Sequence, residues 1–385
     1  MSGLILFIAV YLSIYGGVHA YGFIKIKQGL SFGFWPGLLL LTLMVVMVAA
    51  PVMVRIAEKL GHNSIAHVLA IIGFTWMGLF FVFVSVLFFF DAYRCFLSIG
   101  RFIFQSYFLN ITPTAGFSCV LSMLIACGVM GYGFFEALSI RLEHVTITTD
   151  KLPKDLDSLR IVQISDVHLG VLVGELRLKK ILDKVKTAAP HILVSTGDLV
   201  DGQMEKKDIL AEMFREIETP QGKYAVTGNH EYYAGLSHSL DFTKKAGFVL
   251  LHNETRTLPH LIHIAGIDDP AGRSLGVAGT DSESRLLSTL SNDLFTLLLK
   301  HQPVVDKNST VHFDLQLSGH THNGQIFPFS LLTRLFYKIH PGLTRLRESS
   351  FAYVSRGSGT WGPPIRFLSP PEVTLIEIVR QQRSG

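Results

Sequence analysis

The fold is decided by a stretch that begins at Leu159 and reads Leu-Arg-Ile-Val-Gln-Ile-Ser-Asp-Val-His, ending at His168. Its apolar and β-branched residues predict a buried strand from Leu159 to Ile164. The carboxylate of Asp166 and the imidazole of His168 follow directly after that strand. Carboxylate oxygens and imidazole nitrogens are common ligands of divalent transition metals, so the end of this strand is a candidate metal site.

Similar polar fragments follow other apolar runs further along the chain. In order, they are Gly197-Asp198-Leu199-Val200-Asp201, Gly228-Asn229-His230-Glu231, His301 and Gly319-His320-Thr321-His322. Taken alone, each fragment is a weak signal, because Gly-Asp-x-x-Asp is also a common turn and an isolated histidine is usually structural. Together and in this order, they indicate a two-metal site built at the ends of strands, the arrangement that hydrolysis of phosphate esters uses.

The order and composition of these fragments resemble the calcineurin-like metallophosphoesterases, over residues 141–385. Within that family, the sequence is similar in style to membrane-anchored bacterial phosphodiesterases, a group that includes the UDP-2,3-diacylglucosamine pyrophosphatases. The resemblance implies an α/β domain built as a four-layer α-β-β-α sandwich, with the metals at the edge of the sheets.

The resemblance also implies a role for each fragment. The first metal would be bound by Asp166, His168 and His322, the second by Asn229, His301 and His320, and Asp198 would bridge them. Histidine, carboxylate and amide ligands without cysteine suit manganese, iron or zinc, and we favour manganese. His230 would form a hydrogen bond with Asp201 and protonate the leaving oxygen.

Two arginines near the C-terminus are candidates for binding the phosphate of a substrate. Arg356 lies in Val354-Ser355-Arg356-Gly357, and Arg366 follows Pro363-Pro364-Ile365. A guanidinium group binds a phosphate through two parallel hydrogen bonds, but a structural ion pair uses the same group equally well. Both interpretations remain open for these two residues.

The charges divide the chain into two parts. Hydrophobic residues make up 49% of it and charged residues only 17%, which indicates membrane segments. Residues 1–140 carry six Lys/Arg and three Asp/Glu, whereas residues 141–385 carry 28 and 27. We therefore expect an all-α transmembrane region over 1–140 and the metallophosphoesterase domain over 141–385.

Four stretches in the first part are long and apolar enough to span a bilayer. They run over about residues 4–22, 34–54, 66–90 and 115–135, and predict four transmembrane helices. A signal peptide is the alternative for the first stretch, although it lacks a basic N-terminal region. A buried bundle of soluble helices is the alternative for all four, and their lengths argue against it.

The positive charges between these stretches give a weak orientation. With the C-terminal part in the cytoplasm, six flanking Lys/Arg lie inside and four outside, which favours a multi-pass protein of the cell inner membrane with a cytoplasmic catalytic domain. The expected partners are the lipid bilayer and a phosphorylated substrate. The net charge of +4 is small and dispersed, so nucleic acid is not an expected partner.

The leading hypothesis is a membrane-anchored dinuclear phosphoesterase that hydrolyses phosphodiester or pyrophosphate bonds of a lipid-linked substrate such as UDP-2,3-diacylglucosamine. A broad-specificity phosphodiesterase acting on soluble or cell-wall substrates is the alternative enzyme. A membrane scaffold with a regulatory metal-binding domain is the non-enzymatic alternative. The apolar and basic stretch from Leu331 to Arg347 is either a lip that contacts lipid or an ordinary surface helix.

Overall fold

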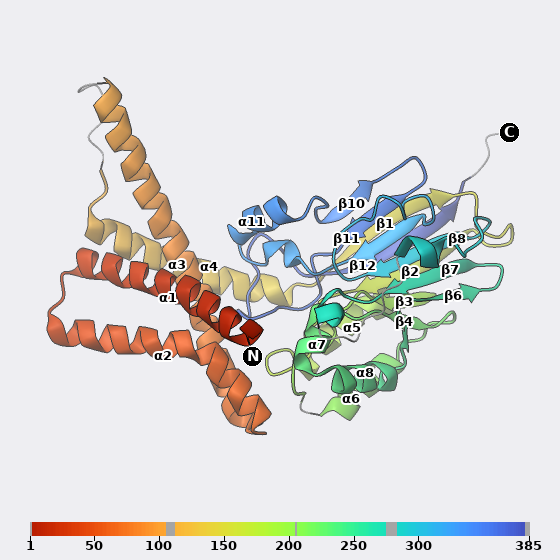
Figure 1. Cartoon of the computed structure of the whole chain (residues 1–385), viewed down its shortest axis with the longest axis horizontal. Helices are drawn as coiled ribbons and strands as arrows, with labels where there is room; N and C mark the ends of the chain where they lie inside the picture. Colours follow the sequence, from red (N-terminus) through yellow and green to blue (C-terminus); the bar gives the residue numbers. More distant parts are fainter. Residues whose placement is uncertain (1, 105–111, 205, 275–282, 382–385) are drawn as a thin grey trace. The chain divides into compact units, whose positions relative to one another are not determined.

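The computed structural model describes residues 2–104, 112–204, 206–274 and 283–381, and the chain forms two compact units. The first unit comprises Met1–Phe134 and Gly362–Pro364, and the second comprises Phe135–Trp361 and Ile365–Gly385. Long helices make up the first unit (Figure 1): α1 (Ser2–Leu30), α2 (Phe34–Lys59), α3 (Asn63–Phe104) and most of α4 (Ala115–Leu138).

Three of the four predicted membrane spans are confirmed as apolar helices of sufficient length. Among the described residues, α2, α3 and α4 are long and apolar enough to cross a membrane. The prediction of four membrane spans is therefore wrong by one for the residues that the structure describes. The first stretch does form α1, but the side chains of residues 2–8 lie outside those described. The remainder of α1 is too rich in glycine, tyrosine and histidine to qualify.

The second unit contains two six-stranded mixed sheets. The first has the order β1-β12-β2-β3-β4-β5 and the second the order β10-β11-β9-β8-β7-β6. The strands of the first sheet are β1 (Arg141–Thr149), β2 (Ser158–Ile164), β3 (Ile192–Ser195), β4 (Lys223–Ala225), β5 (Val249–Leu250) and β12 (Glu372–Arg380). Those of the second are β6 (Glu254–Leu258), β7 (Ile262–Ile267), β8 (Phe295–Lys300), β9 (Leu315–Ser318), β10 (Gly342–Arg345) and β11 (Phe351–Val354).

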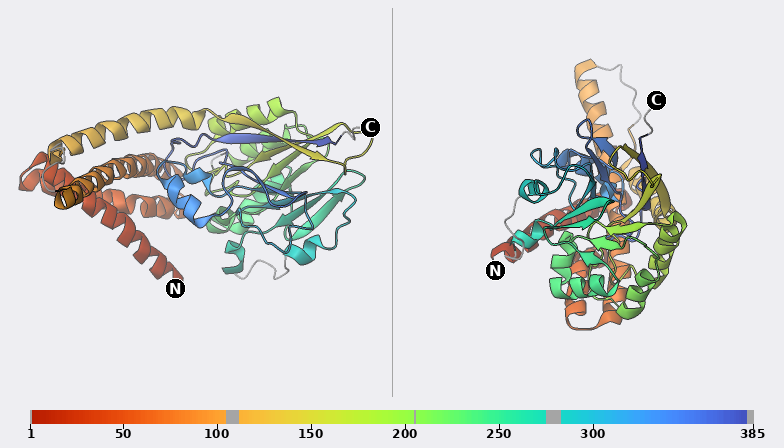
Figure 2. Two further views of the ribbon diagram at one scale, coloured as in Figure 1. Left: turned by 90° about the horizontal axis from the view of Figure 1, so that it is seen from above. Right: turned by 90° about the vertical axis from the view of Figure 1, so that its right-hand side faces the viewer.

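The two sheets pack face to face around a shared apolar core (Figure 2). Ile161 and Ile192 of the first sheet belong to the same buried cluster as Ile264, Leu297 and Leu317 of the second. Burying apolar side chains from both inner faces is what holds two stacked sheets together. The strand predicted from Leu159 to Ile164 is therefore confirmed, as β2, in the central layers of the domain.

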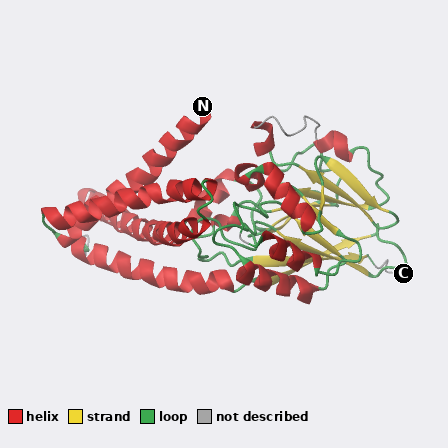
Figure 3. Ribbon diagram, turned by 90° about the horizontal axis from the view of Figure 1, so that it is seen from below, coloured by secondary structure: helices red, strands yellow, loops and turns green. Residues whose placement is uncertain are grey.

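Helices cover the outer faces of both sheets (Figure 3). The first sheet is covered by α5 (Glu175–Ala188), α6 (Lys207–Arg215) and α8 (Leu236–Lys245), whose apolar side chains join one core cluster with Val162 and Leu193. The second sheet is covered by the short helix α10 (Glu283–Leu287), through Leu287. The predicted four-layer α-β-β-α sandwich is thus confirmed, with a thin fourth layer.

The topology brings the predicted polar fragments to one edge of the sandwich. Strands β2, β3 and β4 run parallel in the first sheet, and β8 and β9 run parallel in the second. The carboxyl ends of parallel strands meet at the same edge of a sheet, and in open α/β sheets ligands bind there. The remaining short helices lie in the connections: α7 (Asn229–Ala234), α9 (Ala271–Ser274), η1 (His322–Gly324) and α11 (Phe329–Phe336).

Candidate metal centre

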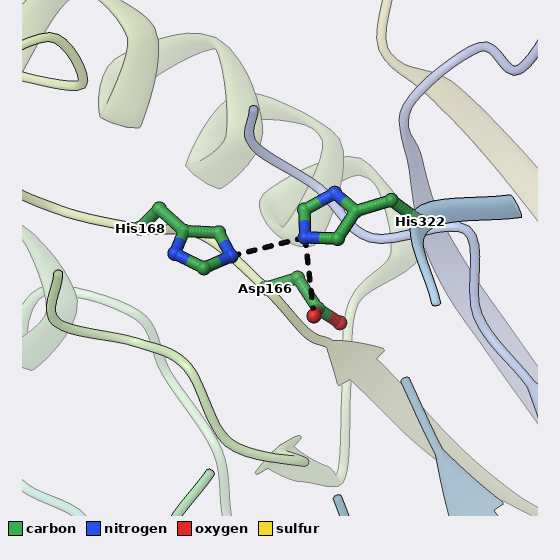
Figure 4. Close-up of side chains that lie close together, drawn as sticks. All are labelled: Asp166, His168 and His322. Carbon is green, nitrogen blue, oxygen red and sulfur yellow. Dashed lines mark hydrogen bonds and ion pairs between the residues drawn. The ribbon is translucent and has the colours of Figure 1, made fainter. Parts of the chain in front are cut away.

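Asp166, His168 and His322 form the first cluster of candidate ligands (Figure 4). All three are buried, and their ligand atoms lie within 4.8 Å of one another. His322 Nε2 is 3.3 Å from Asp166 Oδ1 and 3.0 Å from His168 Nε2. Asp166 and His168 follow β2, whereas His322 comes from the loop after β9, so the cluster joins the edges of both sheets.

The second cluster surrounds His301, which lies directly after β8. His301 Nε2 is 3.1 Å from Asp198 Oδ2, 3.1 Å from His320 Nδ1 and 3.2 Å from Asn229 Oδ1. The opposite nitrogen of the ring, Nδ1, donates a hydrogen bond to the carbonyl oxygen of Thr196 at 2.8 Å. That bond fixes the orientation of His301 and directs Nε2 at the other three groups, as in metal-binding histidines.

Asp198 connects the two clusters through one oxygen. Its Oδ2 lies 3.1 Å from His301 Nε2 in the second cluster and 3.8 Å from His168 Nε2 in the first. Its other oxygen, Oδ1, accepts a hydrogen bond from the backbone N–H of His230 at 2.8 Å. Asp198 therefore occupies the position that a bridging carboxylate requires.

The protonation state of two of the histidines, His168 and His320, fits a cation-binding role. Burial and the neighbouring His230 lower the pKa of His168 to about 3. Burial and the neighbouring His301 lower the pKa of His320 to about 4. Both rings are therefore neutral at neutral pH, and a neutral imidazole is the form that binds a metal. Burial disfavours the charged form of His301, but Asp198 raises its pKa well above the usual value, so a cation at its Nε2 has to displace a proton. Imidazole nitrogens, carboxylates and one amide oxygen converge in a buried space, so the donor set fits divalent cations.

The backbone is left-handed at five of the seven candidate ligands. The φ angles are 53° at Asp166, 55° at His168, 52° at Asp198, 71° at His320 and 49° at His322. Residues other than glycine rarely adopt such angles, which cost about 1–3 kcal/mol each and cluster at functional sites. The chain holds these residues in an unfavourable conformation, and the effect is to turn their side chains toward a common centre.

Two glycines allow the loops that carry these ligands to approach each other closely. A Cβ atom on Gly228 would overlap Oδ1 of Asp198, and one on Gly319 would overlap Ser165 and Asp166. Any larger residue at either position would displace a candidate ligand. The glycine before the His-x-His fragment is therefore required by the close approach of these loops.

Glu231 organises the centre, and the sequence analysis gave it no role. Its carboxylate accepts hydrogen bonds from four backbone N–H groups, those of Asp198, Leu199, Val200 and Gly228, at distances of 2.7–3.1 Å. It thereby joins the loop after β3 to the loop after β4. The spacing of three residues from Gly228 is that of a capping box, which is a sequence signal for such a role.

His230 and Asp201 are in contact, as predicted. His230 Nδ1 lies 2.5 Å from Asp201 Oδ1. Burial disfavours the charged ring, but Asp198 and the hydrogen bond to Asp201 together raise the pKa of His230 to about 9. The ring is therefore protonated at neutral pH and has a proton to give, which is what a general acid requires.

The two candidate arginines make structural contacts. The guanidinium of Arg356 forms ion pairs with Glu143 and Glu372, which is the alternative interpretation of this residue. Arg366 is fully buried and donates hydrogen bonds to the carbonyl oxygens of Gly359 and His322. These contacts hold the loop after β11 against the first cluster. A role in binding substrate stays a prediction for both residues.

Arg366 also lies against a candidate ligand. Its Nη2 is 3.0 Å from Nδ1 of His322. A guanidinium can only donate, so this contact leaves the ring proton of a neutral His322 on Nε2, opposite Asp166. A cation bound at Nε2 would require the other neutral tautomer, with the ring proton on Nδ1, and therefore a shift of the Arg366 guanidinium away from Nδ1.

The chain is similar in sequence to known proteins. A calcineurin-like phosphoesterase domain matches residues 159–324. The chain is 41% identical over 258 residues to an uncharacterized metallophosphoesterase of Aquifex aeolicus, an alignment that covers 66% of this chain and 98% of that protein. It is 32% identical over 324 residues to a transmembrane protein with metallophosphoesterase domain of Danio rerio, covering 80% of this chain and 74% of that protein.

Among solved structures, the 5'-nucleotidase precursor from Thermus thermophilus aligns with a TM-score of 0.36 at 15% identity, over 58% of this chain and 54% of that one. The apolar helices and the transmembrane relative identify a membrane protein. The chain belongs to the calcineurin-like phosphoesterase family and is a metal-dependent hydrolase of phosphoric esters.

Proposed function

We propose that the chain hydrolyses phosphodiester or pyrophosphate bonds at a centre for two divalent cations, with manganese favoured over iron and zinc. The observation that carries this proposal is the position of Asp198 Oδ2 between the two clusters of ligands. The first cation would be held by Asp166, His168 and His322, and the second by Asn229, His301 and His320. When bound, such cations neutralise the phosphoryl oxygens and lower the pKa of water.

His230 would act as the general acid in this reaction. Its Nδ1 is held by Asp201, so the second N–H of the protonated ring, at Nε2, remains to serve the substrate. The proton would pass from Nε2 to the oxygen of the leaving group as its bond to phosphorus breaks. Asp201 acts through His230 and is a positioning residue, because it fixes the orientation of the ring and stabilises its charge.

We assign the substrate to lipid-linked phosphoesters because of helix α11. This helix begins seven residues after His322, and none of its residues is buried. Its apolar side chains are exposed: 81% of Leu335 and 80% of Phe336 are accessible, beside Leu331 and Leu332. Such a face on a membrane protein suits contact with acyl chains.

Two features next to this apolar face support the same assignment. The exposed cations Arg334 and Lys338 lie within and just after α11, where they would meet anionic head groups. The ring of Tyr337, which ends the helix, packs against His320 with centroids 5.5 Å apart. The face is therefore connected to a candidate metal ligand.

The extent of the catalytic domain and its location in the cell are two further parts of the proposal. Residues 141–385 would form the catalytic domain, because every candidate ligand lies within them. The distribution of Lys and Arg favours an inner-membrane protein with this domain in the cytoplasm. A catalytic role is favoured over the scaffold alternative, because residues 159–324 match a phosphoesterase domain and every ligand position of the expected motif holds a suitable residue.

The proposal is tested with the full-length protein in lipid nanodiscs, stripped of metal and reloaded with manganese, iron or zinc. Hydrolysis of bis-p-nitrophenyl phosphate should appear with metal and vanish with chelator, and absence of turnover with all three metals would refute the function. A series of phosphodiesters with lengthening acyl chains tests the substrate class. We expect kcat/KM to rise by up to about fourfold per methylene, the equivalent of about 0.8 kcal/mol. Equal rates along the series would favour the soluble or cell-wall substrates instead.

A further inference from the structure

Two exposed aromatic rings pack against His230. The ring of Tyr233 lies 5.6 Å from that of His230, and the ring of Trp361 lies 5.5 Å from it, centroid to centroid. Both meet His230 nearly edge to face, with interplanar angles of 72° and 69°. His230 itself is buried, yet 68% of Tyr233 and 52% of Trp361 are accessible to solvent. The candidate acid is thus flanked by two large apolar surfaces in contact with water.

Both rings are held in place by the chain around the metal centre. The side chain of Gln325 accepts a hydrogen bond from the backbone N–H of Trp361 at 2.9 Å and donates one to its carbonyl oxygen at 2.8 Å. The backbone N–H of Gln325 in turn donates a hydrogen bond to the backbone carbonyl oxygen of His322 at 2.9 Å. Tyr233 lies on α7, the short helix that begins at Asn229. The position of each ring is therefore tied to a candidate metal ligand.

Packing within the fold does not account for this exposure. Large aromatic side chains usually bury most of their surface, and those left half exposed in pairs are frequent at sites that bind ligands. Tyrosine and tryptophan have only two side-chain torsions, so they provide a large contact area with little loss of conformational entropy. The faces of these two aromatic side chains stack favourably on planar rings, whatever substituents those planar rings carry.

The contact with His230 identifies which part of a substrate these rings would meet. In the proposed hydrolysis, water adds its oxygen to phosphorus, the bond from phosphorus to the leaving oxygen breaks, and His230 gives a proton to that oxygen. The proton lost by the water restores the proton balance. The group attached to the leaving oxygen must therefore extend past His230, between or along the rings of Tyr233 and Trp361.

From this geometry we infer that Tyr233 and Trp361 bind the leaving group of the substrate and select one that carries a planar ring. The inference rests on the proposed function and makes it more specific. Acyl chains would contact α11 beside His320, whereas the planar group would depart beside His230. The two parts of a lipid-linked substrate would then occupy different sides of the metal centre.

The test compares two phosphodiesters in the manganese-loaded full-length protein. Methyl 2-phenylethyl phosphate and methyl 2-cyclohexylethyl phosphate release alcohols of similar size and acidity that differ in planarity. Release of each ring alcohol is followed by chromatography. We expect kcat/KM to favour the phenyl compound by about tenfold, the scale of a single stacking contact. Equal values in an active enzyme would overturn the inference and leave the proposed function standing.

Substitutions assign the preference to the two rings. Trp361→Leu and Tyr233→Leu should each reduce the preference for the phenyl compound several-fold, whereas Trp361→Phe and Tyr233→Phe should retain most of it, because they keep an aromatic face. Trp35→Leu, which removes the exposed ring of a tryptophan in α2, is the matched control and should keep the full preference. Metal content by elemental analysis verifies that each variant is folded. Leucine variants that bind metal and keep the full preference would also overturn the inference.

Discussion

The carboxylate of Glu231 accepts a hydrogen bond from the backbone N–H of Asp198 at 3.0 Å, from a position 33 residues further along the chain. Through this bond and three others, a residue outside the candidate ligands sets the path of the loop that carries Asp198, the candidate bridging carboxylate. The geometry of the centre therefore depends on a buried acceptor behind the ligands as well as on the ligands themselves.

Glu231→Gln should destabilise the protein and weaken its affinity for metal. The amide keeps one acceptor oxygen but turns an NH2 group toward N–H donors, so at least one buried donor is left unpaired. That costs about 1–3 kcal/mol in the free energy of unfolding. Thermal unfolding and metal titration measure the two effects. Glu218→Gln, on the exposed surface, is the control and should change neither quantity. A Glu231→Gln variant as stable as the wild type would contradict this account.

Asp198→Ala should lose both cations, because one carboxylate oxygen lies near both clusters. Elemental analysis of the purified full-length protein, loaded with manganese, gives the number of metal ions per chain. We expect about two for the wild type and fewer than one for the variant. Asp155→Ala, at an exposed position, should bind as the wild type does. Retention of two metal ions by Asp198→Ala would show that this residue is not the bridge.

His230→Ala should keep its metal ions and lose activity. We expect kcat to fall by roughly 10²–10⁴ for substrates with alkyl leaving groups, which need a proton, and by much less for p-nitrophenyl esters, which do not. His260→Ala, at an exposed loop position, is the control. A loss of the same size for both kinds of leaving group would remove His230 from the acid role.

The combined change Leu335→Ser and Phe336→Ser should flatten the dependence of kcat/KM on acyl chain length while sparing substrates with short chains. The reason is that these two side chains form the most exposed part of the apolar face of α11. Leu176→Ser on α5, where the leucine is 83% exposed, removes a similar apolar side chain elsewhere on the same domain. If the dependence of kcat/KM on acyl chain length falls by the same amount in Leu176→Ser, a part of the protein other than α11 is responsible for it.

A fragment that begins at Ala137 should be more stable than one that begins at Arg141, and both should bind metal. Ile140 belongs to the core cluster under α5, and Arg177 on α5 donates a hydrogen bond to the carbonyl oxygen of Ala137. Loss of the buried isoleucine costs about 1.5–3 kcal/mol. Thermal unfolding of the two fragments measures the difference. Equal melting temperatures would contradict it, and a metal-free fragment of either length would contradict the assignment of the whole site to residues 141–385.

Elements with a clear apolar pattern could be predicted from the sequence. The helix α5 begins and ends where its spacing of apolar residues indicates, since Leu178, Ile181, Leu182 and Val185 face the core. The edge strands β6 and β10 escaped prediction because they lie half exposed and carry charged or polar side chains, as in Glu254–Leu258. Each pairs with the next strand along the chain, β6 with β7 and β10 with β11, so distance in the sequence is not the reason. An edge strand that is half exposed needs no regular alternation of apolar and polar residues.

The proximity of the candidate ligands could be predicted because each follows a buried strand, but their surroundings could not. The helix α7 begins at Asn229, in a fragment that reads as a loop, and gives Glu231 and Tyr233 their positions. Trp361 reaches His230 from 131 positions away in the sequence, and only the folded chain brings the two rings together. Contacts between loops of this kind carry no local pattern for a sequence to display.

The left-handed backbone at Asp166, His168, Asp198, His320 and His322 has a consequence for how this chain can change by mutation. Asparagine tolerates that conformation better than most residues. In the genetic code, every codon for aspartate or histidine becomes a codon for asparagine by a change of one base. At each of these five positions, a single base change therefore exchanges the carboxylate or imidazole of a candidate ligand for the weaker amide oxygen of asparagine without adding backbone strain. A folded descendant with a weakened candidate metal centre is thus one base change away at each of the five positions.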